Sequence, residues 1–124
     1  MSKSTVHADR KHYADRLRAA LQVPVDVAKA VDDDYAQVVA ERAATDAGMI
    51  HIFSSEAPSL KLYCNELGRH IARLRDPSTS EADANHEIAL FTTRYSALLE
   101  TMQRMTPRQF ELARAKYRRR LTDQ

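Results

Sequence analysis

Two stretches of the chain repeat apolar residues at steps of three and four, and this pattern constrains the fold more than any other feature. The first stretch consists of Leu60, Tyr63 or Cys64, Leu67, Ile71 and Leu74. The second consists of Ile88, Phe91, Tyr95, Leu98, Met102 and Met105. An α-helix advances about 100° per residue, so each set lies on one stripe of a helix. Other helices must cover such a stripe, which predicts an all-α bundle.

Five helices are expected from the apolar stripes and from the residues that begin and end helices. Their predicted ranges are Thr5–Leu21, Val25–Ala47, Pro58–Arg75, Glu81–Met105 and Pro107–Leu121. We expect a break at Val23 and Pro24, because a proline disfavours helical geometry in the residue before it. Gly48 is expected to end the second helix. The connections are short, which predicts antiparallel packing of successive helices.

The predicted connections carry turn and capping residues. Ser80 is a cap for the fourth helix, and Thr106 followed by Pro107 is a favoured start for the fifth. Residues 76–80 form the clearest loop. The short apolar segment Met49–Phe53 has no second strand to pair with, so we interpret it as a buried connection or a short helical turn.

Helical phase also predicts which side chains face the core. All five tyrosines lie at inward phases: Tyr13, Tyr35, Tyr63, Tyr95 and Tyr117. The second helix is expected to pack through Val27, Val31, Tyr35, Val38 and Val39, and the fifth through Phe110, Ala113, Tyr117 and Leu121. Arg42 lies near the middle of the second helix's stripe. It is therefore either exposed or paired with an acid of another helix, since an unpaired buried guanidinium is costly.

Length and cysteine content set broad limits. With 124 residues the chain is expected to form a single domain, 1–124. Cys64 is the only cysteine, which excludes an internal disulfide and fits a reducing cytoplasm. The first nine residues lack the apolar core of a signal peptide, and no run of about 18 apolar residues predicts a membrane span. We therefore expect a cytoplasmic protein without a membrane partner.

Catalytic and ligand-binding motifs do not stand out in the sequence. His70 is expected at the rim of its stripe with Glu66 further out, and His86 is expected to face water, so no metal site is predicted. Cys64 is expected to be an inert thiol of the core or its edge. Catalytic motifs and glycine-rich phosphate loops are missing from the 124 residues. We therefore predict no enzyme activity, no cofactor and no small-molecule substrate.

The C-terminal helix is the most basic part of the chain. Residues 104–124 contain seven basic and two acidic residues, although the whole chain has a net charge of only +2. Candidate contacts to phosphate or to a partner are Arg108, Arg114, Lys116, Arg118, Arg119 and Arg120. Arginine offers two parallel donors to a phosphate group. The alternative interpretation is that these charges complement the helix dipole and solvate the surface.

Two functional hypotheses follow from these patterns. The first is a non-enzymatic binding or adaptor module that acts through a helical surface, with a protein or a second copy of the chain as its partner. Arg42 and Leu112 are the candidate interface residues, because Leu112 points outward from the fifth helix. The second is a small nucleic-acid-associated regulator that uses the basic C-terminal helix.

Overall fold

The computed structural model describes residues 3–45 and 59–122, which form five helices. They are α1 (Lys3–Ala30), α2 (Asp33–Thr45), α3 (Leu60–Arg75), α4 (Glu81–Met105) and α5 (Pro107–Thr122). The prediction of an all-α bundle is confirmed. The predicted connection Met49–Phe53 and the predicted helix end at Gly48 lie outside the described residues.

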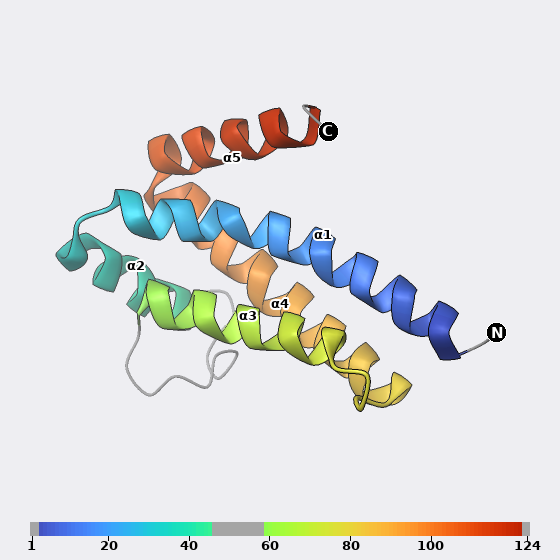
Figure 1. Ribbon diagram of the computed structural model, residues 1–124. Coiled ribbons are helices and arrows are strands. Elements are labelled where there is room, and N and C mark those ends of the chain that lie inside the picture. Colours follow the sequence, from blue (N-terminus) through green and yellow to red (C-terminus); the bar gives the residue numbers. More distant parts are fainter. Residues whose placement is uncertain (1–2, 46–58, 123–124) are drawn as a thin grey trace.

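Helix α1 is the centre of the bundle. It packs against α3 on one side and α5 on the other, and α4 packs against α3 and crosses behind α1 (Figure 1). Helix α4 runs antiparallel to α3, as the short connection between them predicts, and α3 and α5 also run antiparallel to α1. Helix α2 lies at one end of the bundle against α3 and α4.

The two apolar stripes form most of the core, as predicted. The first is buried along its whole length, at Leu60, Tyr63, Cys64, Leu67, Ile71 and Leu74. In the second, Phe91, Leu98 and Met102 are buried, and Ile88, Tyr95 and Met105 pack partly buried against them. Helices α1 and α2 complete the core with Ala14, Leu21, Val27, Val39, Ala40 and Ala43.

The predicted break at Val23 and Pro24 is wrong, because α1 continues through both residues to Ala30. A proline inside a helix lacks the N–H that would donate to the carbonyl four residues earlier, here Ala20. In this structure the Tyr95 hydroxyl donates to that carbonyl oxygen at 2.8 Å. A side chain of α4 thus supplies the hydrogen bond that Pro24 cannot.

Burial of Pro24 and Tyr95 also favours an uninterrupted α1. Pro24 is one of the fully buried residues of the core, and burial raises the pKa of Tyr95 to about 12. The phenol therefore stays protonated and remains a donor at neutral pH. Covering Pro24 with apolar neighbours also offsets the cost of a proline in a helix interior, which is about 3 kcal/mol in exposed helices.

The break between the first two helices lies at Val31 and Asp32, eight residues later than predicted. Helix α2 begins at Asp33, and the Ala36 amide donates to the Asp32 carbonyl oxygen at 2.7 Å. Asp33 and Asp34 occupy the first turn, where the helix dipole favours negative charge. The run of three aspartates was therefore a stronger signal for a helix start than the proline.

Helix caps follow the sequence at α3 and α4. The Ser80 hydroxyl accepts a hydrogen bond from the Asp83 amide at 3.1 Å, as predicted for a cap. The Ser59 hydroxyl does the same for the Leu62 amide at 3.4 Å, so α3 begins at Leu60. Pro107 is the first residue of α5, as predicted.

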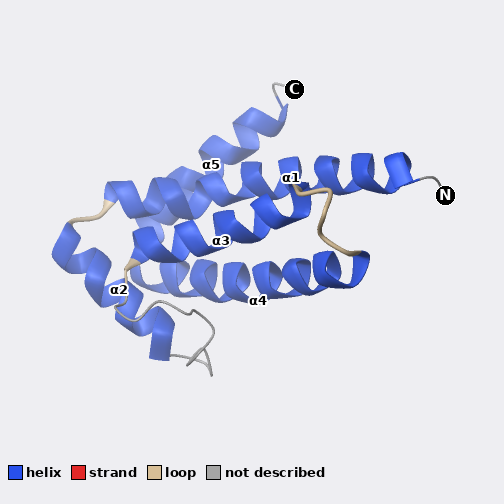
Figure 2. Cartoon of the chain, turned by 60° about the horizontal axis from the view of Figure 1, so that its bottom comes forward, coloured by secondary structure: helices blue, strands red, loops and turns tan. Residues whose placement is uncertain are grey.

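Four residues predicted to face inward are largely exposed: Tyr13, Tyr35, Val38 and Leu121. Tyr35 lies along the end of α4, where its hydroxyl donates to the Met105 carbonyl oxygen, so the ring keeps one edge in water. Helix α5 leaves α1 at an angle toward its C-terminus (Figure 2), which uncovers Leu121. The position of a residue around its own helix does not show where a neighbouring helix ends, so it does not predict which inward residues are covered.

We expect the Tyr95→Phe substitution to lower the free energy of unfolding by about 1–3 kcal/mol, because it leaves the Ala20 carbonyl without its donor. In a Pro24→Ala background the new alanine supplies an amide N–H, so the same substitution should cost less than half as much. Urea denaturation of the four proteins measures both costs. Equal costs in the two backgrounds would show that the hydroxyl does not replace the missing amide.

Candidate functional site

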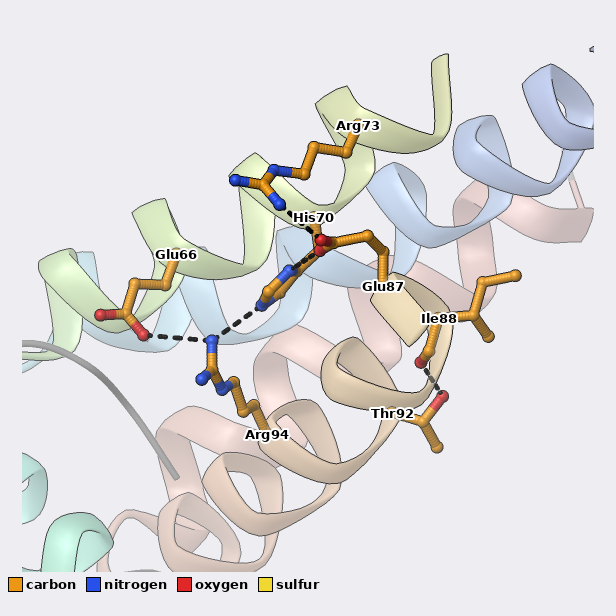
Figure 3. Close-up of polar contacts among 7 residues, drawn as sticks. All are labelled: Glu66, His70, Arg73, Glu87, Ile88, Thr92 and Arg94. Atoms are coloured by element: carbon orange, nitrogen blue, oxygen red, sulfur yellow. Dashed lines mark hydrogen bonds and ion pairs between the residues drawn. The ribbon is translucent and has the colours of Figure 1, made fainter. Parts of the chain in front are cut away.

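A network of charged side chains is buried between α3 and α4 (Figure 3). Glu66 and His70 come from α3 and Glu87 from α4, and all three are less than 9% exposed. The sequence predicts His70 at the rim of its stripe and Glu66 further out; the position of His70 is correct, but the expected exposure of both side chains is wrong. Both residues lie at the edge of the α3 stripe that faces α4, where the second helix covers them.

His70 is held between two side chains of α4. Its Nδ1 contacts Glu87 Oε2, and its Nε2 lies 2.9 Å from an Nη atom of Arg94. A guanidinium group only donates hydrogen bonds, so Nε2 is the acceptor of this contact. We therefore assign the tautomer in which His70 is neutral and donates through Nδ1 to the Glu87 carboxylate.

The two carboxylates of the network each have a cationic neighbour. Glu87 Oε1 accepts a hydrogen bond from an Arg73 Nη atom at 2.8 Å, and Glu66 Oε2 lies 3.6 Å from an Nη atom of Arg94. Burial alone raises the pKa of Glu87, but the hydrogen bonds from His70 and Arg73 outweigh it and lower the pKa below its ordinary value. The carboxylate is therefore charged at neutral pH.

These contacts join α3 to α4. Both ring nitrogens of His70 are engaged, and Nε2, the atom that a general base would use, faces the Arg94 guanidinium (Figure 3). Spacing could have revealed the network, because Glu66 and His70 are four residues apart and Glu87 and Arg94 are seven apart. Both pairs therefore lie on one face of their helix, beside its apolar stripe.

The described part of the chain contains neither a cluster of metal ligands nor an ionised cysteine. Residues 3–45 and 59–122 contain no cluster of three histidine, cysteine or acidic side chains that would hold a metal ion. Cys64 is buried as predicted, and burial raises the pKa of its thiol to about 12. The thiol therefore stays protonated at neutral pH and is a poor nucleophile.

A hollow of about 640 Å³ lies where α1, α2 and α3 meet. Its walls include the apolar side chains of Val25, Ala36 and Leu60, and the exposed Lys29 and Lys61 also border it. A second hollow of about 350 Å³ lies between the end of α1 and α5, and Leu112 forms part of its wall. Leu112 is therefore beside a depression of the surface as well as exposed.

The six basic residues predicted on α5 do not form one uniform surface. Arg114 is half-buried, with its guanidinium 5.5 Å from the centre of the Phe110 ring and 3.7 Å from Glu111. Lys116 lies 4.0 Å from Asp26 of α1. The other four are exposed, and they are Arg108, Arg118, Arg119 and Arg120. Two of the six candidates thus contact acidic side chains of the same chain.

A stripe of four exposed residues runs along the outward side of α5. It consists of Arg108, Leu112, Ala115 and Arg119, and we call it the α5 stripe. The residues are separated by four, three and four positions, so they lie on one face. Leu112 is 64% exposed, which makes it the most exposed large apolar side chain in the described residues.

The second candidate interface residue, Arg42, is exposed on α2 and does not lie beside Leu112 on the same helix. Next to it is an outward stripe with the same spacing as the α5 stripe. It consists of Asp34, Val38, Glu41 and Thr45, all exposed, and we call it the α2 stripe. Helical phase did not reveal this stripe, because it places Val38 among the residues that face the core.

No protein-family model, no curated protein and no solved structure matches the chain. Within the described residues, no helix combines the length and apolarity needed to cross a membrane.

We expect Glu87→Gln to destabilise the fold by about 1.5–3 kcal/mol, because a neutral amide weakens the hydrogen bonds that the buried carboxylate accepts from His70 and Arg73. Arg73→Gln removes the other end of the same contact, but the Arg73 side chain is 69% exposed. It should cost less than about 1 kcal/mol. Thermal and urea denaturation compare the two variants, and similar losses would show that burial does not decide the strength of this contact.

The lowered pKa of Glu87 also predicts a pH dependence. A carboxyl whose folded pKa lies below its unfolded value, about 4.3, stabilises the fold above that value. This contribution disappears as the pH falls through the folded pKa. The stability difference between wild type and Arg73→Gln should therefore be constant near neutral pH and shrink below about pH 4. A difference that grows on acidification would contradict the direction of the shift.

Proposed function

We propose that the protein is a non-enzymatic binding module that docks an acidic partner protein through the α5 stripe. The observation that carries this proposal is the position of Leu112, which is 64% exposed between two exposed arginines, Arg108 and Arg119. Neither arginine forms an ion pair with a carboxylate among the described residues. An apolar centre with cationic ends is a surface that an acidic helix or loop complements.

The basic residues of α5 and the apolar Leu112 contribute differently to binding of the proposed partner. Helix α5 contains six basic residues and one acidic residue, which gives it a net charge of +5. Exposed ion pairs contribute only about 0–1 kcal/mol each, so the charges steer and select the partner. Full burial of a leucine side chain contributes about 1.5–3 kcal/mol, so Leu112 supplies affinity.

The same observation favours a protein partner over a nucleic acid. A phosphate backbone presents charge and sugar to a bound helix, and most of its contacts are made by polar and basic side chains. Leu112 and Ala115 occupy the middle of the α5 stripe, where such a backbone would leave them without a matching apolar surface.

A nucleic-acid partner is the second candidate, and a different observation favours it. Arg118, Arg119 and Arg120 follow one another at the exposed C-terminal end of α5. Consecutive helical residues point in three directions about 100° apart, so together they can contact phosphates that wrap around the helix end. Leu112 has no part in this mode of binding.

Two probes separate the candidates. We expect a synthetic amphipathic peptide with a leucine stripe flanked by glutamates to bind, as measured by fluorescence anisotropy. Leu112→Ser should weaken this binding about tenfold, the loss expected for a partly buried leucine. Leu62→Ser is the matched control, because Leu62 is an exposed leucine on α3, and it should bind the peptide like wild type.

A short DNA duplex is the second probe, at about 50 mM and about 200 mM salt. Binding that falls steeply with salt, survives Leu112→Ser and is lost in the double variant Arg118→Gln and Arg120→Gln would favour the nucleic-acid candidate. Absence of peptide binding at about 1 mM, or equal binding by Leu112→Ser and wild type, would contradict docking through the α5 stripe.

A further inference from the structure

We infer that a second copy of this chain fits the α5 stripe, through its α2 stripe of Asp34, Val38, Glu41 and Thr45. This inference rests on the proposed function, because it names the occupant of the same docking surface. The two stripes lie on different helices and are both exposed, so neither is covered within one copy.

The residues of the two stripes match in order when the helices lie parallel. Both stripes have intervals of four, three and four residues, so equivalent positions face each other along the contact. Arg108 then faces Asp34, and Leu112 faces Val38. Arg119 then faces Thr45, and Glu41 lies one helical turn away, within reach of the long arginine side chain.

The apolar pair is the centre of this contact. Leu112 is 64% exposed and Val38 is 48% exposed, and each lies between charged residues of its own stripe. Placing the two side chains together removes apolar surface of both from water. A leucine and a valine on exposed helix faces are thereby explained by one contact.

The charges of the two helices are opposite. Helix α5 has a net charge of +5, and α2 has three acidic residues and one basic residue, a net charge of −2. Glu41 accepts a hydrogen bond from the Gln37 amide at 3.2 Å, which leaves its negative charge in place. Two copies of α5 repel each other, so charge selects the contact of α5 with α2 over contacts between identical helices.

The size and symmetry of the contact set its strength. One helix pair buries less than the roughly 1,200 Å² typical of stable complexes, so the association is weak and transient. Because the two stripes are different surfaces, one contact is heterologous, and two copies form a closed dimer only by exchanging both contacts. The average mass should therefore rise with protein concentration and fall as salt screens the charges.

Charge reversal in one stripe tests the contact. We expect sedimentation at about 10–500 µM to show self-association of wild type that is at least about tenfold weaker in the R108E/R119E variant. The D34K/E41K variant, reversed in the other stripe, should lose association to a similar degree. The K11E/R18E variant has the same change in net charge on exposed positions of α1 and should associate like wild type.

Mixing the two reversed variants tests directly whether the two stripes bind each other. R108E/R119E has an acidic α5 stripe and D34K/E41K has a basic α2 stripe, so the mixture should recover association that neither variant shows alone. The controls are two single chains that keep the net charge of wild type. R108E/R119E/D34K/E41K has both stripes reversed, whereas R108E/R119E/D9K/E100K has two acidic stripes, with the added lysines on exposed residues of α1 and α4. The chain with both stripes reversed should associate and the chain with two acidic stripes should not, and circular dichroism confirms that each variant remains helical.

Several outcomes would overturn the inference. They are a wild type that stays monomeric throughout the range, reversed variants that associate like wild type, reversed variants that do not recover on mixing, and an R108E/R119E/D9K/E100K chain that associates as well as the mixture. In each case the acidic peptide remains an independent probe of the α5 stripe. Peptide binding without self-association would retain the proposed function and remove only the second copy as its partner.

Discussion

The bundle depends on α1 remaining one helix across Pro24. Helices α3, α4 and α5 all contact α1, and only an uninterrupted helix provides a surface long enough for them. The hydrogen bond from the Tyr95 hydroxyl to the Ala20 carbonyl oxygen makes this continuity compatible with a proline. The contact comes from α4, so the local geometry of α1 is stabilised by tertiary structure, and the two cannot form independently.

The charged network between α3 and α4 has a different role from the apolar core. Burying carboxylates and guanidinium groups is costly, and their mutual attraction often no more than offsets this cost. Apolar stripes pack with tolerance for small shifts along the helix, whereas the contacts of His70 with both Glu87 and Arg94 are made at one register only. The network therefore contributes to the choice of one alignment of the two helices, which in turn places the start of α5.

That placement determines the surfaces available for binding. Helix α5 packs on α1 through a narrow side that includes Phe110 and Ala113, and the remainder of the helix faces outward. The exposed Leu112, the arginines around it and the acidic α2 stripe are consequences of how few residues hold each of these helices to the bundle. A helix that buries few of its side chains leaves more of its surface available for a partner.

The sequence by itself determined the helices and most of the core. The steps of three and four residues in α3 and α4 specify a buried stripe in any bundle, and the cap at Ser80 and the helix start at Pro107 depend only on neighbouring residues. Only the tertiary structure decided the continuity of α1, the burial of Glu66 and His70, and the exposure of Val38 and Leu121. Each of these depends on a side chain or a helix end from elsewhere in the chain, and local phase and propensity contain no information about which neighbour lies opposite.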